Sequence, residues 1–137
     1  MRAVVFITDD EQAIRAAIVK RLTRQGHRVV GYESGEALLE ALRHELPDLV
    51  LLDLKMPGLN GLDTLKNLRQ LAPSAIVIML TAYGTVQDAV EAMKLGAYDF
   101  LIKSVDLEGI DPVVARVLDV VSLRRRLEAE LEHRDSQ

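Results

Sequence analysis

Residues 48–58 read DLVLLDLKMPG, and this stretch decides the fold class. An unbroken apolar run such as Leu49 to Leu52 is typical of a strand buried on both faces, and we expect a strand over 48–52. The strand ends at the acidic Asp53, and Pro57-Gly58 then turn the chain toward the next element. Strands of this kind indicate a parallel sheet covered by helices on both sides.

Four other short runs of β-branched and apolar residues flank this strand along the chain. Together the expected strands are 3–7, 28–32, 48–52, 75–80 and 98–102. Segments with helical spacing separate them, and Ile14, Ile18 and Leu22, for example, recur every four residues. Five strand–helix units in succession predict an α/β fold with right-handed crossovers. The fold class that we expect is flavodoxin-like, a doubly wound parallel five-stranded sheet of strand order 2-1-3-4-5.

The last helix is expected to be unusually long. Asp111 and Pro112 fit the N-cap and the first helical position, and no Gly or Pro follows before Gln137. A helix to about Arg134 would be roughly 35 Å long at 1.5 Å per residue, more than a domain of this size can cover. We therefore expect a compact domain over residues 1–121. Residues 122–137 would be a helical extension, or a linker to an output module absent from this chain.

Composition excludes several classes of protein. The chain has 137 residues, 49% hydrophobic and 28% charged, which is the balance of one globular domain. It has no cysteine, so a disulfide framework and a thiolate metal site are both excluded. The net charge of −4 and the 4% aromatic content argue against direct nucleic-acid binding by this chain. Its apolar runs are too short for a membrane span or a signal peptide, so we expect a soluble, cytoplasmic protein.

Polar residues follow the expected strands at the points where the strands end: Asp9, Asp10, Asp53, Thr81 and Lys103. Carboxyl ends of parallel strands meet at one edge of a sheet, and ligands bind where the strand order reverses. Converging carboxylates repel each other, and Mg²⁺, which prefers oxygen ligands, would relieve that repulsion. Carboxylates, Mg²⁺, a lysine and a hydroxyl together predict a phosphoryl-transfer site with an aspartate as nucleophile.

Each of these residues taken singly has an ordinary structural explanation. Asp9 or Asp10 would serve as a helix N-cap, and Lys103 as a surface charge. Asp53 would be a solvated strand end and Thr81 a turn residue. Their joint placement at one edge of the sheet is what favours the functional interpretation.

Several motifs occur in a fixed order: Asp9-Asp10, residues 51–58 with Gly61 behind them, Thr81-Ala82, and residues 96–100 followed by Lys103. In these motifs, and over about residues 3–121, the sequence resembles the receiver domain of bacterial two-component response regulators. The resemblance implies a phosphorylatable signalling switch and not an enzyme. A histidine kinase would donate the phosphoryl group, and the switch would control an output domain or a partner protein.

The resemblance implies a role for each acidic residue. Asp53 corresponds to the phosphoacceptor. Asp10 and Asp53 correspond to the carboxylates that bind Mg²⁺ directly, with the backbone carbonyl of Lys55 as a third ligand, and Asp9 to a carboxylate that reaches the metal through water. The acyl phosphate is expected to hydrolyse slowly, and Lys55 and Tyr83 occupy the variable positions that tune this hydrolysis in the family.

Three further residues correspond to those that respond to phosphorylation. Lys103 matches the lysine that pairs with the phosphoryl group, Thr81 the switch hydroxyl, and Phe100 the aromatic side chain that changes rotamer with it. One residue departs from the pattern, because Ser104 stands where the family has a proline in a cis peptide. A cis bond before a non-proline residue costs about 3 kcal/mol. Either Lys103–Ser104 is cis at that cost, or this loop differs from its relatives.

The expected extension carries a stripe of leucines at Leu123, Leu127 and Leu131, with arginines and glutamates around it. These leucines lie beyond the domain body, so we expect the segment to pair with a second chain and form a homodimer.

Two alternatives to a receiver cut from a longer regulator stay open. One is a free-standing receiver that acts by protein contact alone. The other is an aspartate-nucleophile phosphohydrolase acting on external phosphoesters. It is disfavoured because such enzymes carry their nucleophile in an Asp-x-Asp motif after the first strand, whereas here the expected nucleophile follows the third strand.

Overall fold

The computed structural model describes residues 2–82, 84–103 and 107–135. Within these ranges strands and helices alternate along the chain: β1 (Val4–Thr8), α1 (Gln12–Arg24), β2 (Arg28–Tyr32), α2 (Gly35–Ala41), β3 (Leu49–Leu52), α3 (Gly61–Leu71), β4 (Ile76–Thr81), α4 (Val86–Lys94), β5 (Asp99–Ile102) and α5 (Ile110–Asp135). The alternation confirms the α/β class predicted from the hydrophobic runs.

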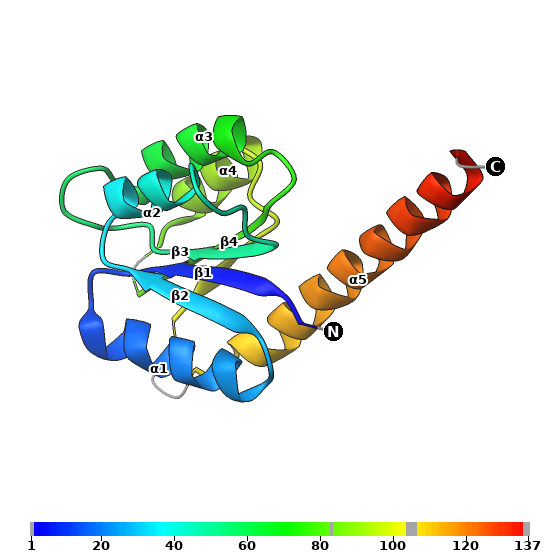
Figure 1. The fold of residues 1–137 in the computed structure, drawn as a ribbon. Coiled ribbons are helices and arrows are strands. Elements are labelled where there is room, and N and C mark those ends of the chain that lie inside the picture. The colour runs from blue at the N-terminus through cyan, green and yellow to red at the C-terminus, as the bar shows by residue number, and fades with distance from the viewer. Residues whose placement is uncertain (1, 83, 104–106, 136–137) are drawn as a thin grey trace.

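The strands form one parallel sheet in the order β2-β1-β3-β4-β5. Figure 1 shows α1 and the first half of α5 on one face of the sheet, and α2, α3 and α4 on the other. Each face has its own apolar core, one built around Ile18, Leu22 and Val117 and the other around Leu38, Leu65 and Leu68. The sheet is therefore doubly wound, as the sequence predicted.

Burial of the strands follows the sequence pattern. Every residue of β3 and β4 is buried, whereas the residues of β2 at the sheet edge are either exposed or half-buried. The expected strands 3–7 and 75–80 are shifted by one residue, because β1 and β4 run on to include Thr8 and Thr81. The shift matters for function, since it places both threonines inside the sheet at its carboxyl end.

The helix α5 begins at Ile110, so the prediction that Asp111 is its N-cap is wrong. Asp111 lies in the first turn, and its carboxylate accepts hydrogen bonds from Arg21 of α1 at 2.8 and 2.6 Å. A bidentate partner on the neighbouring helix holds this carboxylate away from the backbone that a cap would bind.

The predicted length of α5 is confirmed. Its 26 residues span about 39 Å at 1.5 Å per residue, and Figure 1 shows its second half leaving the body of the molecule. No helix among the described residues is both long and apolar enough to cross a membrane.

Candidate functional site

The acidic residues meet where the strand order reverses, between β1 and β3. Thr8 of β1 lies opposite Leu52 of β3, and the amide of Asp53 donates to the carbonyl of Thr8 at 3.0 Å. The next residues of both strands therefore emerge side by side. Carboxylate oxygens of Asp9, Asp10 and Asp53 all lie within 4.8 Å of one another. The sequence predicted this convergence, and the geometry confirms it.

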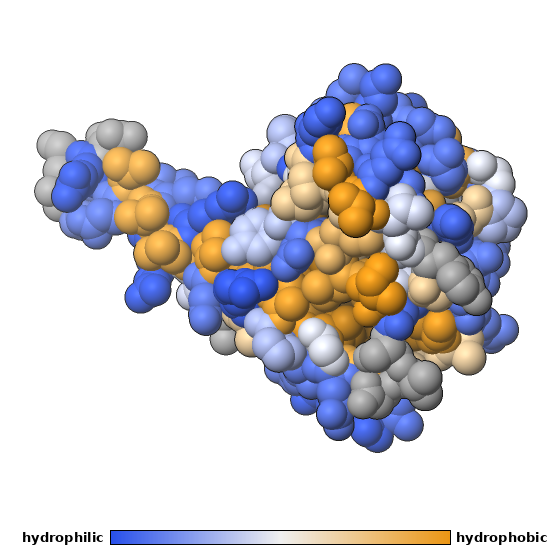
Figure 2. Space-filling model, turned by 180° about the vertical axis from the view of Figure 1, so that it is seen from behind, coloured by the Kyte–Doolittle hydropathy of each residue, from blue (hydrophilic) through white to orange (hydrophobic). Residues whose placement is uncertain are grey.

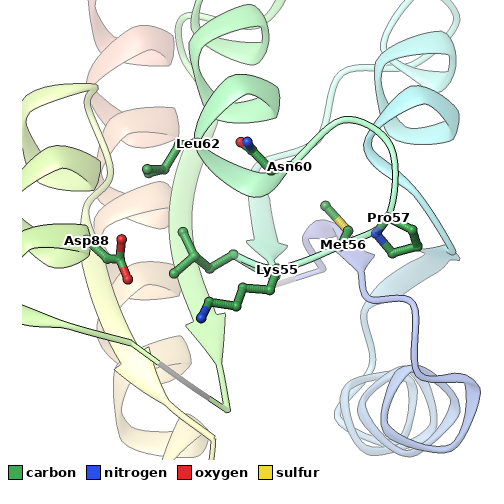
Figure 3. Close-up of a pocket in the computed structure, with 7 residues that line it drawn as sticks. Lys55, Met56, Pro57, Asn60, Leu62 and Asp88 are labelled. Atoms are coloured by element: carbon green, nitrogen blue, oxygen red, sulfur yellow. The ribbon is translucent and has the colours of Figure 1, made fainter.

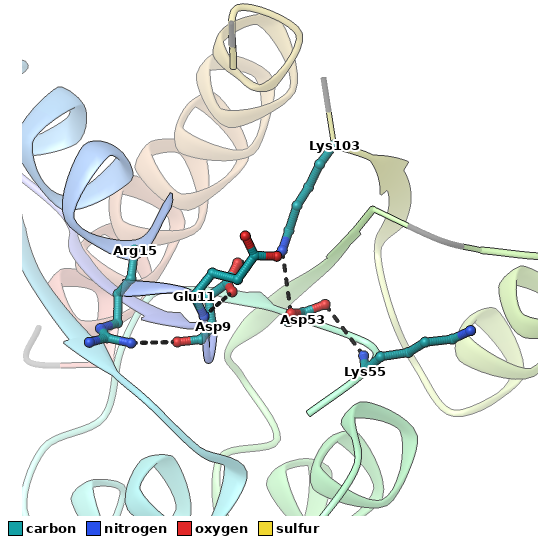
Figure 4. A network of polar contacts seen from close by, with 6 residues as sticks. All are labelled: Asp9, Glu11, Arg15, Asp53, Lys55 and Lys103. Carbon is teal, nitrogen blue, oxygen red and sulfur yellow. Dashed lines mark hydrogen bonds and ion pairs between the residues drawn. The ribbon is translucent and has the colours of Figure 1, made fainter. Parts of the chain in front are cut away.

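Lys103 joins the acidic residues from the end of β5. Its Nζ lies 2.6 Å from Asp9 Oδ2 and 3.3 Å from Asp53 Oδ2, as Figure 4 illustrates for Asp53. The three side chains are nearly inaccessible, at 5% exposure for Lys103, 1% for Asp9 and 6% for Asp53. The lysine thus bridges two buried carboxylates in this state of the protein, a pairing that the sequence did not predict.

Burial changes the acid–base properties of this cluster. Desolvation, only partly offset by Lys103 and reinforced by the charge of Asp9, raises the pKa of Asp53 to about 6. Desolvation alone would lower the pKa of Lys103, but its bonds and charge contacts with Asp9 and Asp53 raise it. The lysine is therefore charged at neutral pH. The carboxylates keep an unfavourable surplus of negative charge that a cation would neutralise.

Asp10 and Lys55 form the exposed rim of the cluster. The backbone amide of Lys55 donates to Asp53 Oδ1 at 3.3 Å, while the Lys55 side chain extends away from the carboxylates (Figure 4). It reaches into a neighbouring pocket of about 480 Å³. Figure 3 shows that pocket, whose lining residues are Leu54, Lys55, Met56, Pro57, Asn60, Leu62 and Asp88.

The loop after β3 folds back tightly over Asp53. The amide of Gly61 donates to the carbonyl of Leu54 at 2.8 Å, and a Cβ at position 61 would lie 2.3 Å from the carbonyl oxygen of Asp53. Glu36 of α2 supports the same loop by accepting from the amide of Leu59 at 2.7 Å. Only a glycine at position 61 allows this close approach.

The predicted switch residues lie on β4 and on the edge strand β5 that pairs with it. Thr81, the last residue of β4, is 1% exposed, and its carbonyl accepts from the amide of Lys103 at 2.7 Å. Phe100 of β5 is half-buried and packs against the core under α2, α3 and α4. The predictions for Tyr83 and for the Lys103–Ser104 peptide bond fall outside the described residues.

Sequence reasoning missed Arg15, which supports the acidic loop from α1. Its Nη1 donates to the carbonyl of Asp9 at 2.7 Å, and the amide of Glu11 donates to Asp9 Oδ1 at 2.9 Å (Figure 4). One arginine among several on an exposed helix carries no signal that would single it out. The two bonds hold Asp9 in its buried position.

The donor set is suited to a hard divalent cation. Three carboxylates converge, one of them exposed to solvent, and no sulfur or imidazole is among them. Mg²⁺ is typically held by one or two carboxylates together with water and phosphate oxygens. The residues present therefore fit Mg²⁺, the cofactor that the sequence predicted.

Comparison with known proteins identifies relatives of this chain. The chain is 37% identical over 117 residues to the DNA-binding transcriptional regulator NtrC of Klebsiella pneumoniae, which covers 85% of this chain and 25% of NtrC. It is 40% identical over 116 residues to the response regulator protein FleR of Pseudomonas aeruginosa, covering 85% of this chain and 24% of FleR. The chain thus spans about a quarter of the length of these two relatives.

A solved structure shares the fold and part of the sequence. The response regulator TrrA of Thermotoga maritima, in complex with Mg²⁺-BeF, aligns with a TM-score of 0.76 and 28% identity, over 85% of this chain and 99% of that one. The model of the response regulator receiver domain family matches residues 5–115. Together with the sheet order and the acidic cluster, this match establishes that the chain belongs to the response regulator receiver domain family.

Proposed function

We propose that this chain is a phosphorylatable switch in which Asp53 accepts a phosphoryl group from a histidine kinase in the presence of Mg²⁺. Receiver domains of two-component systems are signalling switches and receive phosphoryl groups from histidine kinases. The observation that carries the assignment to Asp53 is its position. It is the buried carboxylate that lies beside both Asp9 and the Nζ of Lys103.

Four residues would hold the metal. Asp10 and Asp53 would bind it directly, with the Lys55 carbonyl as a third ligand, and Asp9 would reach it through water. When bound, Mg²⁺ supplies positive charge that offsets the carboxylates and the phosphoryl oxygens. The converging oxygens and the raised pKa of Asp53 support this assignment. The Mg²⁺-BeF complex of TrrA, a relative with the same fold, supports it independently.

The proposed transfer moves a phosphoryl group from a histidine nitrogen to a carboxylate oxygen. An oxygen of Asp53 forms the new bond to phosphorus as the bond between phosphorus and the donor nitrogen breaks. Lys103 then pairs with a phosphoryl oxygen in place of a carboxylate, and the hydroxyl of Thr81 donates to another. Water later hydrolyses the acyl phosphate and restores the carboxylate. We propose that Lys55, whose side chain is exposed beside the cluster, influences this slow step.

The new bonds of Lys103 and Thr81 are the proposed signal. Thr81 and Phe100 lie on neighbouring strands, with Thr81 two residues beyond Met79, the residue that faces Phe100. Movement of the Thr81 hydroxyl toward the phosphoryl group changes the packing around Phe100. We propose that the aromatic ring changes rotamer in response and alters the surface formed by α4 and β5.

Phosphorylation of Asp53 is tested with acetyl phosphate, with and without Mg²⁺, by intact-mass spectrometry. The wild type should gain one phosphoryl group only with Mg²⁺, and Asp53→Asn should gain none because the charged nucleophile is gone. Asp63→Asn, a change at an exposed carboxylate of α3, is the matched control and should behave as the wild type. Equal incorporation into Asp53→Asn and the wild type would reject the assignment.

The proposed domain division is a receiver over residues 1–121 and a helical linker over 122–137 that leads to an output module. The support is that the relatives extend well beyond the matched region, since this region is a quarter of NtrC. A free-standing receiver is the alternative, and the length of the complete gene separates the two.

A phosphohydrolase would release phosphate from p-nitrophenyl phosphate, and we expect this chain to release none above the Asp53→Asn background.

We propose that the extension pairs with the same segment of a second chain. Leu123, Leu127 and Leu131 are 50%, 55% and 57% exposed on a helix that has left the body. Figure 2 shows apolar side chains running along this extension. Pairing would bury them and gain about 25 cal/mol for each Å² of apolar surface removed from water.

Sedimentation of a variant that disrupts the stripe tests the pairing. Leu127→Glu with Leu131→Glu should shift the protein to the monomer without loss of helix. The control Ala129→Glu with His133→Glu places two glutamates on the opposite side of the helix and should leave the dimer intact. A wild type that is monomeric at high micromolar concentration, phosphorylated or not, would remove the proposal.

A further inference from the structure

Gly84 lies in the loop between β4 and α4, three residues after Thr81. A Cβ added at this position would lie 2.7 Å from Cε1 and 2.8 Å from Cζ of Phe100, and 3.1 Å from Cδ1 of Ile102. Carbon atoms that are not bonded pack at about 3.5–4.0 Å. The space that a side chain of residue 84 would need is therefore already occupied, chiefly by the Phe100 ring.

The contact joins two segments that belong to the proposed switch. Phe100 projects from β5, while Gly84 belongs to the loop that Thr81 begins. The ring atoms nearest to Gly84 are Cε1 and Cζ, at the far end of the side chain, so rotation about the Cα–Cβ bond moves them furthest. A side chain at position 84 and the Phe100 ring in its present position therefore cannot occupy the same space.

We propose that Gly84 is a positioning residue for the Phe100 switch, because the missing side chain at position 84 admits the ring to the place it occupies in this structure. The inference rests on the proposed function, in which Phe100 changes rotamer on phosphorylation. A larger residue at position 84 would take away one of the ring positions between which the switch moves. The protein would then hold a single Phe100 conformation with or without a phosphoryl group.

The composition of the chain makes this directly measurable. It contains two phenylalanines, Phe6 and Phe100. Phe6 is fully buried and packs edge-on against Tyr32 at 5.2 Å between ring centroids, so it is an internal reference. Labelling with 2-fluorophenylalanine yields two fluorine resonances. It also keeps the fluorine away from the ring atoms that face Gly84.

The fluorine spectrum of the full chain is recorded with Mg²⁺ alone and with Mg²⁺ and beryllofluoride, a phosphoryl analogue. In the wild type, beryllofluoride should shift the Phe100 resonance and leave that of Phe6 unchanged. In Gly84→Ala the Phe100 resonance should already be displaced with Mg²⁺ alone, and beryllofluoride should add less than a fifth of the wild-type shift. An undisplaced resonance that keeps its full response would overturn the proposal.

A matched glycine controls for the substitution itself. A Cβ at Gly26, in the turn between α1 and β2, would have no neighbour within 4 Å. Gly26→Ala should leave the Phe100 resonance and its response as in the wild type. A displacement of Phe100 in Gly26→Ala equal to that in Gly84→Ala would also overturn the proposal.

A second measurement separates the ring contact from any effect on the backbone of the loop. Gly84→Ala should lower the urea midpoint when Phe100 is present and leave it unchanged in a Phe100→Leu background, where the ε and ζ carbons are absent. The same loss in both backgrounds would place the cost in the backbone or in the contact with Ile102 and refute the role of the ring.

Failure of the proposed function has a different signature. If beryllofluoride does not shift Phe100 in the wild type, the rotamer switch is wrong. The displacement caused by Gly84→Ala and its dependence on Phe100 would still report the contact itself.

Discussion

Charged side chains are arranged differently at the two ends of the sheet. At the carboxyl end, Asp9 and Asp53 share Lys103, and these side chains are at most 6% exposed. At the amino end, Asp48 pairs with Arg125 of α5 at 2.6 Å, and these side chains are 21% and 44% exposed. One end holds buried carboxylates in excess of the buried cation, whereas the other holds a solvated pair that is balanced.

The balanced pair also satisfies the backbone. Asp48 Oδ2 accepts from the amide of Val4 at 2.8 Å, and Arg125 donates to the carbonyl of Arg2 at 3.0 Å. Arg124 donates to the carbonyl of Ser74 at 3.3 Å. These bonds tie the start of the helical extension to the sheet. Charge at the amino end is therefore paired and stabilises the structure, whereas the surplus charge at the carboxyl end is what the proposed metal site requires.

Lys103→Ala should have the largest effect, because it removes the buried cation at the carboxyl end of the sheet. Removal of one partner from a buried ion pair leaves charge without compensation, at a cost of about 3–5 kcal/mol. We expect a loss of this order in urea unfolding at neutral pH without Mg²⁺, and partial recovery when Mg²⁺ is added. Lys55→Ala, which removes an exposed lysine beside the same site, should cost less than about 0.5 kcal/mol. Equal losses in the two variants would mean that the buried ion pairs of Lys103 contribute no more to the free energy of unfolding than an exposed lysine does.

Asp53→Asn should have the opposite effect and raise the free energy of unfolding. The pKa of Asp53 is raised from its ordinary value of 3.8 to about 6, so its ionised form is disfavoured in the folded protein. A shift of about two pH units corresponds to about 3 kcal/mol.

The variant should therefore be more stable than the wild type above pH 6, by an amount of that order at most. The difference should shrink as the pH falls from 6 to 4 and vanish below 4, where the carboxyl is protonated in both states. Urea unfolding at pH 4, 5, 6 and 7 without Mg²⁺ measures it. An Asn variant that is less stable at pH 7 would show that the site carries no surplus of negative charge.

Asp10→Asn should weaken metal binding at the exposed rim of the site. The carboxylate loses its charge but keeps its shape, so Mg²⁺ affinity should fall about tenfold or more, which is about 1.4 kcal/mol. Titration calorimetry with MgCl₂ measures the change, with Asp88→Asn on α4 as the control. Unchanged affinity in Asp10→Asn would place the metal elsewhere.

Arg125→Ala should have the smallest effect. Its partly exposed pair with Asp48 is of the kind that contributes about 0.2–1 kcal/mol, and salt should reduce the contribution. The loss in urea unfolding should be measurable at 20 mM NaCl and small at 1 M NaCl. Arg126→Ala, one residue further on the exposed face of α5, is the control. A loss that does not depend on salt would assign the effect of Arg125 to packing.

Much of the fold and of the site was predictable because the spacing of apolar residues along the sequence indicates which segments are buried. The apolar runs at 48–52 and 75–80 became β3 and β4, whose residues are all buried. The acidic and polar residues at the strand ends then had to meet, since parallel strands place their carboxyl ends at one edge. Asp111 is the counter-example, because its N-cap signal was local while its partner, Arg21, is 90 residues away.

The sequence by itself determined the class of the sheet, the long last helix, and which residues stand at the carboxyl edge. These features follow from side-chain periodicity and from the order of strands, which a linear pattern contains. Only the tertiary structure decided that Lys103 bridges Asp9 and Asp53, that Arg125 reaches Asp48, and that the Phe100 ring fills the space beside Gly84. Such contacts join distant segments, and their distances depend on how crossovers and loops bring those segments together in three dimensions.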